Sequence, residues 1–155
     1  MIYILAIFLP LFGAAIAGFF GSWIKNKGAQ FVTCSSLLLS AIFSLIILND
    51  VALQHETKNI QLFSWVLSGS FEVNWALKFD TLTAVMLVVV TVVSCAVHFY
   101  SIGYMHNDQA YSRFFSYLNL FVFSMLVLIA AADFFFLIVG WALVGLASYL
   151  LIGFY

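Results

Sequence analysis

The chain has 155 residues, of which 66% are hydrophobic and only 7% charged, and its mean hydropathy is +1.18. Soluble domains are about half apolar and about a quarter charged, so this composition excludes a globular fold with a water-exposed surface. The formal net charge of −1 provides no basic field and excludes nucleic acid as a partner.

The cysteines and the N-terminus narrow the class of protein further. Cys34 and Cys95 lie inside apolar runs, and neither has a Cys or His partner at metal-ligand spacing. We interpret both as reduced cysteines that pack among apolar side chains, and we predict no metal site. The first basic residue, Lys25, follows the first apolar run, whereas a cleaved signal peptide carries its positive charge before that run. We therefore expect the first segment to stay in the protein.

The first 48 residues predict two membrane-spanning helices, since about 20 mainly apolar residues cross about 30 Å of hydrocarbon. Residues 2–24 carry no charge, and Pro10 within them is tolerated where neighbouring groups satisfy the carbonyl that it frees. Residues 25–28 predict a polar turn, and residues 31–48 predict the second span. By the positive-inside rule, this turn lies on the cytoplasmic or matrix side and the N-terminus lies outside.

Residues 49–80 predict an external loop that contains a small β-hairpin. Its charged side chains exclude it from a bilayer core: Asp50, Glu56, Lys58, Glu72, Lys78 and Asp80. Apolar residues alternate with polar ones at Phe71, Val73, Trp75, Leu77 and Phe79, a period of two that is typical of a strand with one buried face. A less regular run at 60–66 precedes Ser68, Gly69 and Ser70 and predicts the partner strand. The hairpin could contact a neighbouring subunit or pack only on its own helices.

The second half of the chain predicts three more spans. Residues 82–102 form one, with Asp80 or Thr81 as its N-cap. The apolar run that follows Arg113 would extend about 60 Å as one helix, about twice the membrane core, so it must fold back. A carboxylate costs about 2.5 to 3.5 kcal/mol at the midplane, which places the break near Asp133. The last two spans are then residues 113–132 and 134–155.

These elements predict one membrane domain over residues 1–155. The expected fold class is an all-α integral membrane protein of about five transmembrane helices with a small external β-hairpin. The last span ends without the polar or basic flank that usually anchors one, so we expect the chain to be an N-terminal portion of a longer protein.

Three runs, in their order and spacing, resemble a known family. They are VNWALKFDTLTAVMLVVVTVVSCAVHFYSIGYMHND from Val73, YSRFFSYLNLFVFSMLVL from Tyr111 and GWALVGLASYLLIGFY from Gly140. Together they resemble subunit L of bacterial NADH:quinone oxidoreductase, the antiporter-like membrane subunit of respiratory complex I. The resemblance covers essentially the whole chain.

The resemblance implies a membrane-arm component of a proton-translocating oxidoreductase, in which quinone reduction elsewhere drives proton transfer. It implies no cofactor on this chain, with NADH, FMN, iron–sulfur clusters and quinone bound by other subunits. Other membrane subunits of complex I and the lipid bilayer would be its partners, in the bacterial inner membrane in preference to the mitochondrial one. Two alternatives stay open: a subunit of a multisubunit sodium/proton antiporter, and a non-catalytic remnant or assembly piece.

Three positions bear on a proton path. His98 is a candidate relay because imidazole titrates near neutral pH, although we favour an interface histidine that packs beside Phe99 and Tyr100. Asp133 is a candidate for the mouth of an entry path, but capping of the last helix is the simpler interpretation. The family has a membrane glutamate where this chain has Ala142. A methyl group cannot bind a proton, so the resemblance implies that this relay is missing.

Overall fold

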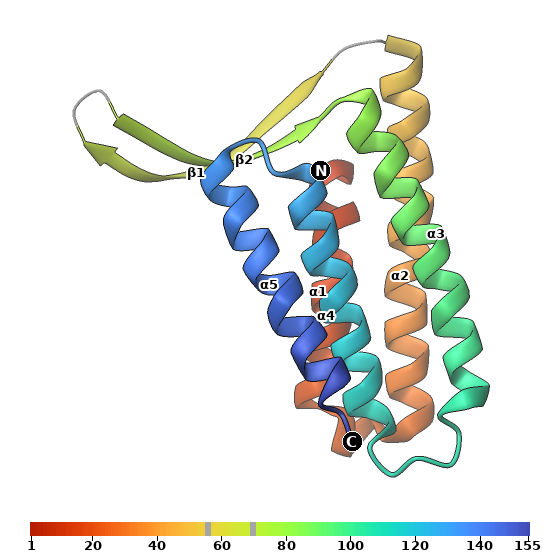
Figure 1. The fold of residues 1–155 in the computed structure, drawn as a ribbon. Helices are drawn as coiled ribbons and strands as arrows, with labels where there is room; N and C mark the ends of the chain where they lie inside the picture. The colour runs from red at the N-terminus through yellow and green to blue at the C-terminus, as the bar shows by residue number, and fades with distance from the viewer. Residues whose placement is uncertain (55–56, 69–70) are drawn as a thin grey trace.

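The computed structural model describes residues 1–54, 57–68 and 71–155, and in these ranges the chain forms five helices and one two-stranded sheet (Figure 1). The helices are α1 (Ile2–Phe19), α2 (Gly21–Gln54), α3 (Thr81–Tyr104), α4 (Tyr111–Ala130) and α5 (Phe134–Ile152). The strands are β1 (Lys58–Ser68) and β2 (Phe71–Phe79). All five helices are long and apolar enough to cross a membrane. The predicted multi-pass helical fold with a small hairpin is confirmed.

The two ends of the bundle differ in charge. The N-terminus and the hairpin lie at one end, whereas the α1–α2 turn, the α3–α4 loop and the C-terminus lie at the other (Figure 1). Lys25 and Lys27 near the start of α2 and Arg113 near the start of α4 belong to the second end. By the positive-inside rule we expect this end to face the cytoplasm or the matrix, and we call it the inner end. The hairpin end is the outer end.

The turn between α1 and α2 is tighter than the sequence predicted. It lies at Phe20, whereas residues 25–28, where the turn was expected, are helical. The Phe20 amide donates to the Ile16 carbonyl at 3.0 Å, and its own carbonyl accepts the Trp23 amide at 3.0 Å. One residue therefore serves both helix ends. Polar residues at the membrane edge continue the helix because their side chains reach water without opening the backbone ladder.

Helix α2 is also longer than the predicted second span. Its 34 residues extend about 51 Å, well beyond the thickness of a hydrocarbon core. The sequence predicted an external loop from residue 49, but the helix continues to Gln54. Asp50 therefore lies on helical backbone, near the outer end of α2.

The structure confirms the two strands of the predicted hairpin. Inward positions that the structure describes are buried or half-buried: Val73, Trp75, Leu77 and Phe79. The Phe71 side chain and the expected turn at 69–70 lie outside the described part of the chain. The two strands pair antiparallel, with two irregularities in their register.

The connection between α4 and α5 covers part of the free edge of β2. Ala131 forms a bridge with Leu77, and the Ala132 amide donates to the Ala76 carbonyl at 3.1 Å. The Trp75 ring lies 4.8 Å from the ring of Phe136 in α5. This part of the hairpin therefore packs on its own helices, while the far end projects beyond the bundle (Figure 1).

Candidate functional site

Helix α4 faces α1 with a row of hydroxyl groups. Ser112 and Ser116, one turn apart, donate to the carbonyls of Ala17 and Ala14 at 2.7 Å each. Small residues on α1 allow this approach, since a Cβ at Gly18 would lie 2.8 Å from Ser116 Oγ. Such bonds between membrane helices contribute about 0.6 kcal/mol each on average.

Pro10 leaves one backbone carbonyl of α1 without its helical hydrogen bond, and a side chain of α2 supplies a donor for it. A proline has no amide to donate to the carbonyl four residues earlier, which here belongs to Ala6. The Ser40 hydroxyl of α2 donates to that carbonyl instead. The expectation that a neighbouring group satisfies the freed carbonyl is confirmed, and Ser40 is the residue that does so.

One turn above Ser116, a polar contact joins three helices. Asn119 Nδ2 donates to Ser36 Oγ at 3.2 Å, and the Ser36 hydroxyl donates to the Thr33 carbonyl at 2.8 Å. Gly13 of α1 makes room for this pair, because a Cβ there would overlap both Ser36 Oγ and Asn119 Nδ2. The contact therefore depends on residues of α1, α2 and α4 together.

His98 lies inside the bundle and not at the interface. Its side chain is fully buried, and its ring meets the edge of Phe115 at 5.8 Å. Phe99 and Tyr100 are exposed, so the prediction that His98 packs beside them at the interface is wrong. His98 Nδ1 lies 2.9 Å from the Ser94 carbonyl, which can only accept, so Nδ1 carries a hydrogen. By its place on the helix, His98 lies about 9 Å above the inner end of α3.

His98 and Asn119 meet with unpaired polar atoms. The Asn119 side chain interacts with the imidazole, yet neither His98 Nε2 nor Asn119 Oδ1 reaches a hydrogen-bond partner among the described residues. Both atoms are buried, and a buried polar atom without a partner costs about 1 to 3 kcal/mol. We call Ser36, His98 and Asn119 the His98 cluster.

The sequence analysis identified only one member of the His98 cluster. A usable signal for Asn119 was present, since Ser112, Ser116 and Asn119 follow one another at spacings of four and three residues along an apolar span. That spacing places them on one helix face. No comparable signal indicates that Gly13 and Ser36 lie opposite, because this contact depends on the packing of separate helices.

The two predicted caps behave differently. Asp80 Oδ1 accepts the Thr83 amide at 2.7 Å, and this hydrogen bond holds the pKa of Asp80 below its usual range, with Lys78 adding to the effect. Asp133 occupies the N-cap position of α5 with extended backbone, but its side chain makes no capping hydrogen bond. It is exposed and lines a cavity of about 440 Å³ beside the hairpin, at the outer end.

Ala142 lies on the uncovered part of α5. The buried positions of this helix are Phe136, Gly140 and Ala147, whereas Ala142 is exposed. Gly140 allows the close approach to α4, since a Cβ there would lie 2.9 Å from Leu128 Cα. The structure therefore does not gather the three candidate positions: His98 is inside the bundle, Asp133 is at its outer end, and Ala142 is on an open face.

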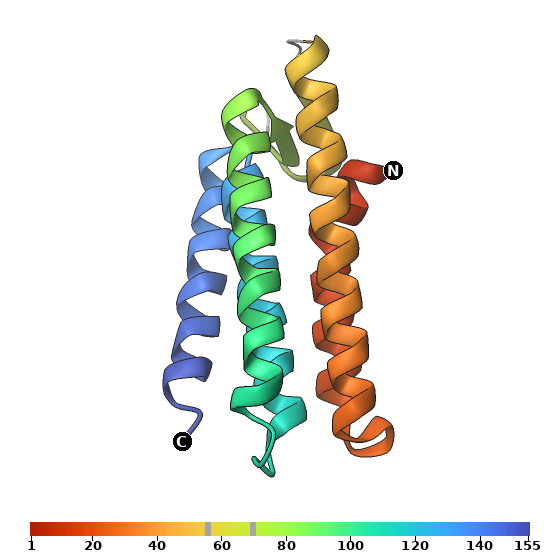
Figure 2. The same ribbon diagram turned by 90° about the vertical axis from the view of Figure 1, so that its right-hand side faces the viewer.

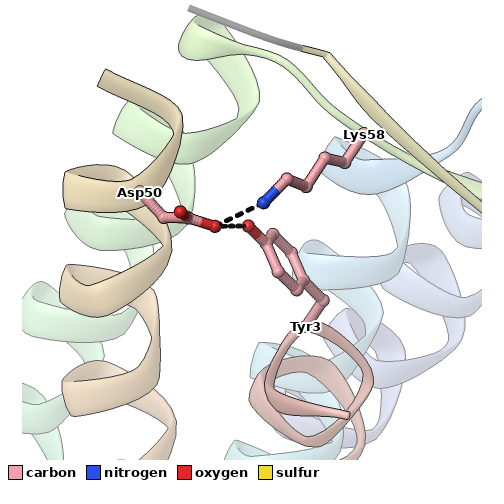
Figure 3. A network of polar contacts seen from close by, with 3 residues as sticks. All are labelled: Tyr3, Asp50 and Lys58. Carbon is pink, nitrogen blue, oxygen red and sulfur yellow. Dashed lines mark hydrogen bonds and ion pairs between the residues drawn. The ribbon is translucent and has the colours of Figure 1, made fainter. Parts of the chain in front are cut away.

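At the outer end, Asp50 of α2 joins α1 and β1 (Figure 3). Its Oδ2 accepts the Tyr3 hydroxyl and lies 2.6 Å from Lys58 Nζ, which is also 5.2 Å from the centre of the Tyr3 ring. The hydrogen bond to Asp50 raises the pKa of Lys58. This network fastens the hairpin and both N-terminal helices to one another.

Near the inner end, two cavities are lined in part by α2. One of about 860 Å³ lies between the α1–α2 turn and the start of α4, and Lys27 and Arg113 line it. The other, of about 480 Å³, lies between α2 and α3, and its lining includes Cys34, Ser35 and Phe99.

The chain matches known sequences over nearly its full length. The family described as NADH-Ubiquinone oxidoreductase (complex I), chain 5 N-terminus matches residues 65–115. Identity is 46% over 153 residues to NADH-ubiquinone oxidoreductase chain 5 of Chondrus crispus and 48% over 152 residues to NADH-quinone oxidoreductase subunit L of Rickettsia typhi. These alignments cover 99% and 98% of this chain but 23% of each relative. The chain thus spans about a quarter of the length of the curated relatives.

A solved structure shares the fold. It is a chain of the membrane-bound sulfane sulfur reductase, an archaeal respiratory membrane complex, with a TM-score of 0.74 and 19% sequence identity. The match covers 97% of this chain and 23% of the other. At this identity the likeness supports the arrangement of the helices and nothing about chemistry.

Proposed function

Because the chain belongs to the family of NADH:quinone oxidoreductase chain 5 and subunit L, we propose that it works as a membrane-arm component of a proton-translocating oxidoreductase. Identity of 46% to 48% over nearly the whole chain carries this proposal. Quinone reduction would take place on other subunits, and this chain would contribute to the transfer of protons across the membrane.

The proposal includes partners, cofactors and location. The five apolar spans make this a multi-pass membrane protein, and the bacterial inner membrane is the location that we propose for it. Its partners would be other membrane subunits of the complex. NADH, FMN, iron–sulfur clusters and quinone would bind those other subunits and not this chain.

Assembly tests the function directly. The chain, tagged at one end, is expressed in cells from which the native gene has been deleted, and membranes are solubilised in a mild detergent. We expect it to migrate with NADH-oxidising activity on native gels and through two purification steps. A chain that is stably inserted in the membrane but never migrates with that activity would overturn the proposal.

Ala142 limits the part that this chain plays in proton transfer. We propose that the family relay carried by a membrane glutamate is absent here, because position 142 has no ionisable group. Ala142→Glu is expected to raise the number of protons moved per electron in the assembled complex. Ala142→Gln, of the same size but without a titratable group, is the matched control and should change nothing. Equal stoichiometry in all three complexes would refute the missing relay.

A further inference from the structure

The side chains of the His98 cluster can form two different hydrogen-bonding patterns. His98 Nδ1 donates to the Ser94 carbonyl, so in the neutral ring Nε2 is an acceptor. Asn119 Nδ2 donates to Ser36 Oγ, which leaves the Asn119 oxygen as the unpaired atom of the amide that adjoins the imidazole. His98 Nε2 and Asn119 Oδ1 are thus two acceptors without a partner among the described residues, on two fully buried side chains that interact. One proton between them would satisfy both.

We propose that the His98 cluster is a proton-binding site, in which uptake of one proton at His98 Nε2 is coupled to a flip of the Asn119 amide. In the protonated form, Nε2–H donates to Asn119 Oδ1, Nδ2 donates to Ser36 Oγ, and the Ser36 hydroxyl donates to the Thr33 carbonyl. The last two bonds are those present in the structure, at 3.2 and 2.8 Å.

The neutral form has its own complete pattern. When the proton leaves Nε2 for water, the amide turns by half a rotation, so that Nδ2 donates to Nε2. The Ser36 hydroxyl then turns from the Thr33 carbonyl to donate to Asn119 Oδ1. The N–H bond at Nε2 is the one covalent bond made or broken, and the proton is exchanged with water. Each state satisfies Nε2 and both polar atoms of the amide.

The surroundings favour a proton over a larger ligand. The neighbouring titratable groups on the packed elements are Cys34 of α2, Cys95 of α3 and Tyr111 of α4, and none carries a charge at neutral pH. Helix α1 contributes Gly13 to the cluster and no titratable group near it. The one carboxylate on these four helices, Asp50, lies at the outer end with Tyr3 and Lys58. The hydrogen-bonding atoms of the cluster are therefore its acceptors.

A cavity on the inner side is lined by sequence neighbours of two cluster residues. The cavity between α2 and α3 is lined by Cys34 and Ser35, which directly precede Ser36, and by Phe99, which directly follows His98. Lys27 lines the same cavity at the membrane edge.

The test is a titration of the full chain in lipid nanodiscs by solid-state NMR, with ¹⁵N-labelled histidine and asparagine and with His55→Gln to simplify the spectrum. We expect Nδ1 of His98 to carry hydrogen throughout, Nε2 to titrate between about pH 4 and 9, and the Asn119 amide signal to change at the same midpoint. A His98 that stays neutral over this range, or an Asn119 signal that does not change together with His98, would overturn the proposal.

Two variants separate the cluster from general packing. Asn119→Leu keeps the size but removes the acceptor, so the proton affinity of His98 should fall at least about tenfold, a shift of about one pH unit. Asn119→Asp should raise it at least about tenfold. Ser124→Ala is the control, because the Ser124 hydroxyl bonds only to the Leu120 carbonyl of its own helix. Unchanged affinity in either Asn119 variant would contradict the proposal, and the Asn119→Asp result decides it if Asn119→Leu does not fold.

The role of this site in translocation rests on the proposed function, but the titration does not. If the chain fails to assemble with the oxidoreductase while His98 and Asn119 titrate together, only the proposed function falls. If it assembles and His98 never titrates, only the proton site falls.

Discussion

Helices α4 and α5 are nearly equal in length, at 20 and 19 residues, but they are held in the bundle in different ways. Helix α4 buries ten side chains and reaches α1 and α2 through hydroxyl and amide groups. Helix α5 buries two side chains and Gly140, and this glycine lets the backbones of α4 and α5 approach closely. Figure 2 shows it at the side of the bundle, away from α1 and α2. Apolarity therefore identifies both as spans without showing which lies inside.

The difference follows from the environment of a membrane helix. Lipid is as apolar as a leucine side chain, so helices gain little from burying more apolar surface and associate through close packing and polar bonds. Helix α4 is held by both close packing and polar bonds, whereas α5 is held mainly by close packing. The remaining face of α5 presents large apolar side chains, as suits lipid or another helix.

The largest expected effect breaks the contact between α4 and α5. In Gly140→Ala, the new methyl group would lie 2.9 Å from Leu128 Cα and 3.0 Å from its amide nitrogen, so backbone must move. We expect a loss of about 1 to 3 kcal/mol in the free energy of unfolding, measured by titration with SDS in mixed micelles. Amide exchange should increase along α5 and not along α1.

Gly145→Ala is the matched control, on the same helix. A Cβ at Gly145 meets nothing within 4 Å, so this change should be neutral, or stabilising by up to about 1 kcal/mol through helix propensity. Equal effects at both glycines would mean that α5 is not held by close approach.

The second effect concerns the polar bonds of the interior. Ser40→Ala leaves the Ala6 carbonyl without a donor, because Pro10 has no amide, and we expect a cost of about 1 to 3 kcal/mol. In a Pro10→Ala background the new amide bonds this carbonyl, so the cost of Ser40→Ala should fall. The same SDS titration, run as a double-mutant cycle, measures the difference.

Ser44→Ala provides the comparison for this cycle. The Ser44 hydroxyl bonds to the Ser40 carbonyl of its own helix, at 2.9 Å, so its loss leaves no backbone group unpaired. We expect less than about 0.5 kcal/mol. If Ser40→Ala costs the same with and without Pro10, the bond between α1 and α2 does not serve the open carbonyl.

The smallest effect compares the N-caps of α3 and α5. Asp80→Ala removes a cap that is hydrogen-bonded to Thr83 and should cost about 1 kcal/mol, whereas Asp133→Ala removes a side chain without such a bond and should cost less. Amide exchange in the first turn of each helix reports the two changes. Similar protection losses in both would show that the caps do not differ.

The Asp80 contribution should depend on pH. Its pKa in the folded chain is lowered by the Thr83 amide, so the carboxylate stabilises the fold fully above the unfolded value of about 4. The contribution is lost as the pH falls through the lower, folded pKa. Native chain and Asp80→Ala should therefore converge in stability at acid pH, and a constant difference would contradict the cap.

The sequence predicted the spans better than their ends. The spans at 82–102 and 113–132 agree closely with α3 and α4, because long apolar runs follow directly from the thickness of the bilayer. The turn expected at 25–28 was wrong, because Lys25 and Lys27 mark the membrane edge and a helix passes through that edge without a break. Composition shows where the chain meets the membrane–water interface. The position of the turn depends instead on where the backbone groups at the two helix ends can form hydrogen bonds.

The candidate residues show the same limit. His98 was identified from its titratable ring, but its burial was not, because residues on either side of it in the sequence are exposed. Asn119 of α4 interacts with it and bonds Ser36 of α2 beside Gly13 of α1, and Ser36 and Asn119 are more than 80 positions apart along the chain. No local sequence pattern predicts a contact between residues so far apart along the chain.

By itself, the sequence determined that lipid surrounds this chain, that it crosses the bilayer several times, and that its relatives are subunits of complex I. These properties depend on composition, segment length and residue order, which can all be read directly from the sequence. Only the tertiary structure decided which helix lies inside, that Ser40 completes the ladder opened by Pro10, and that His98 adjoins Asn119. Those contacts need helices distant in sequence to pack within hydrogen-bond range, and apolar side chains of similar hydropathy do not specify that packing.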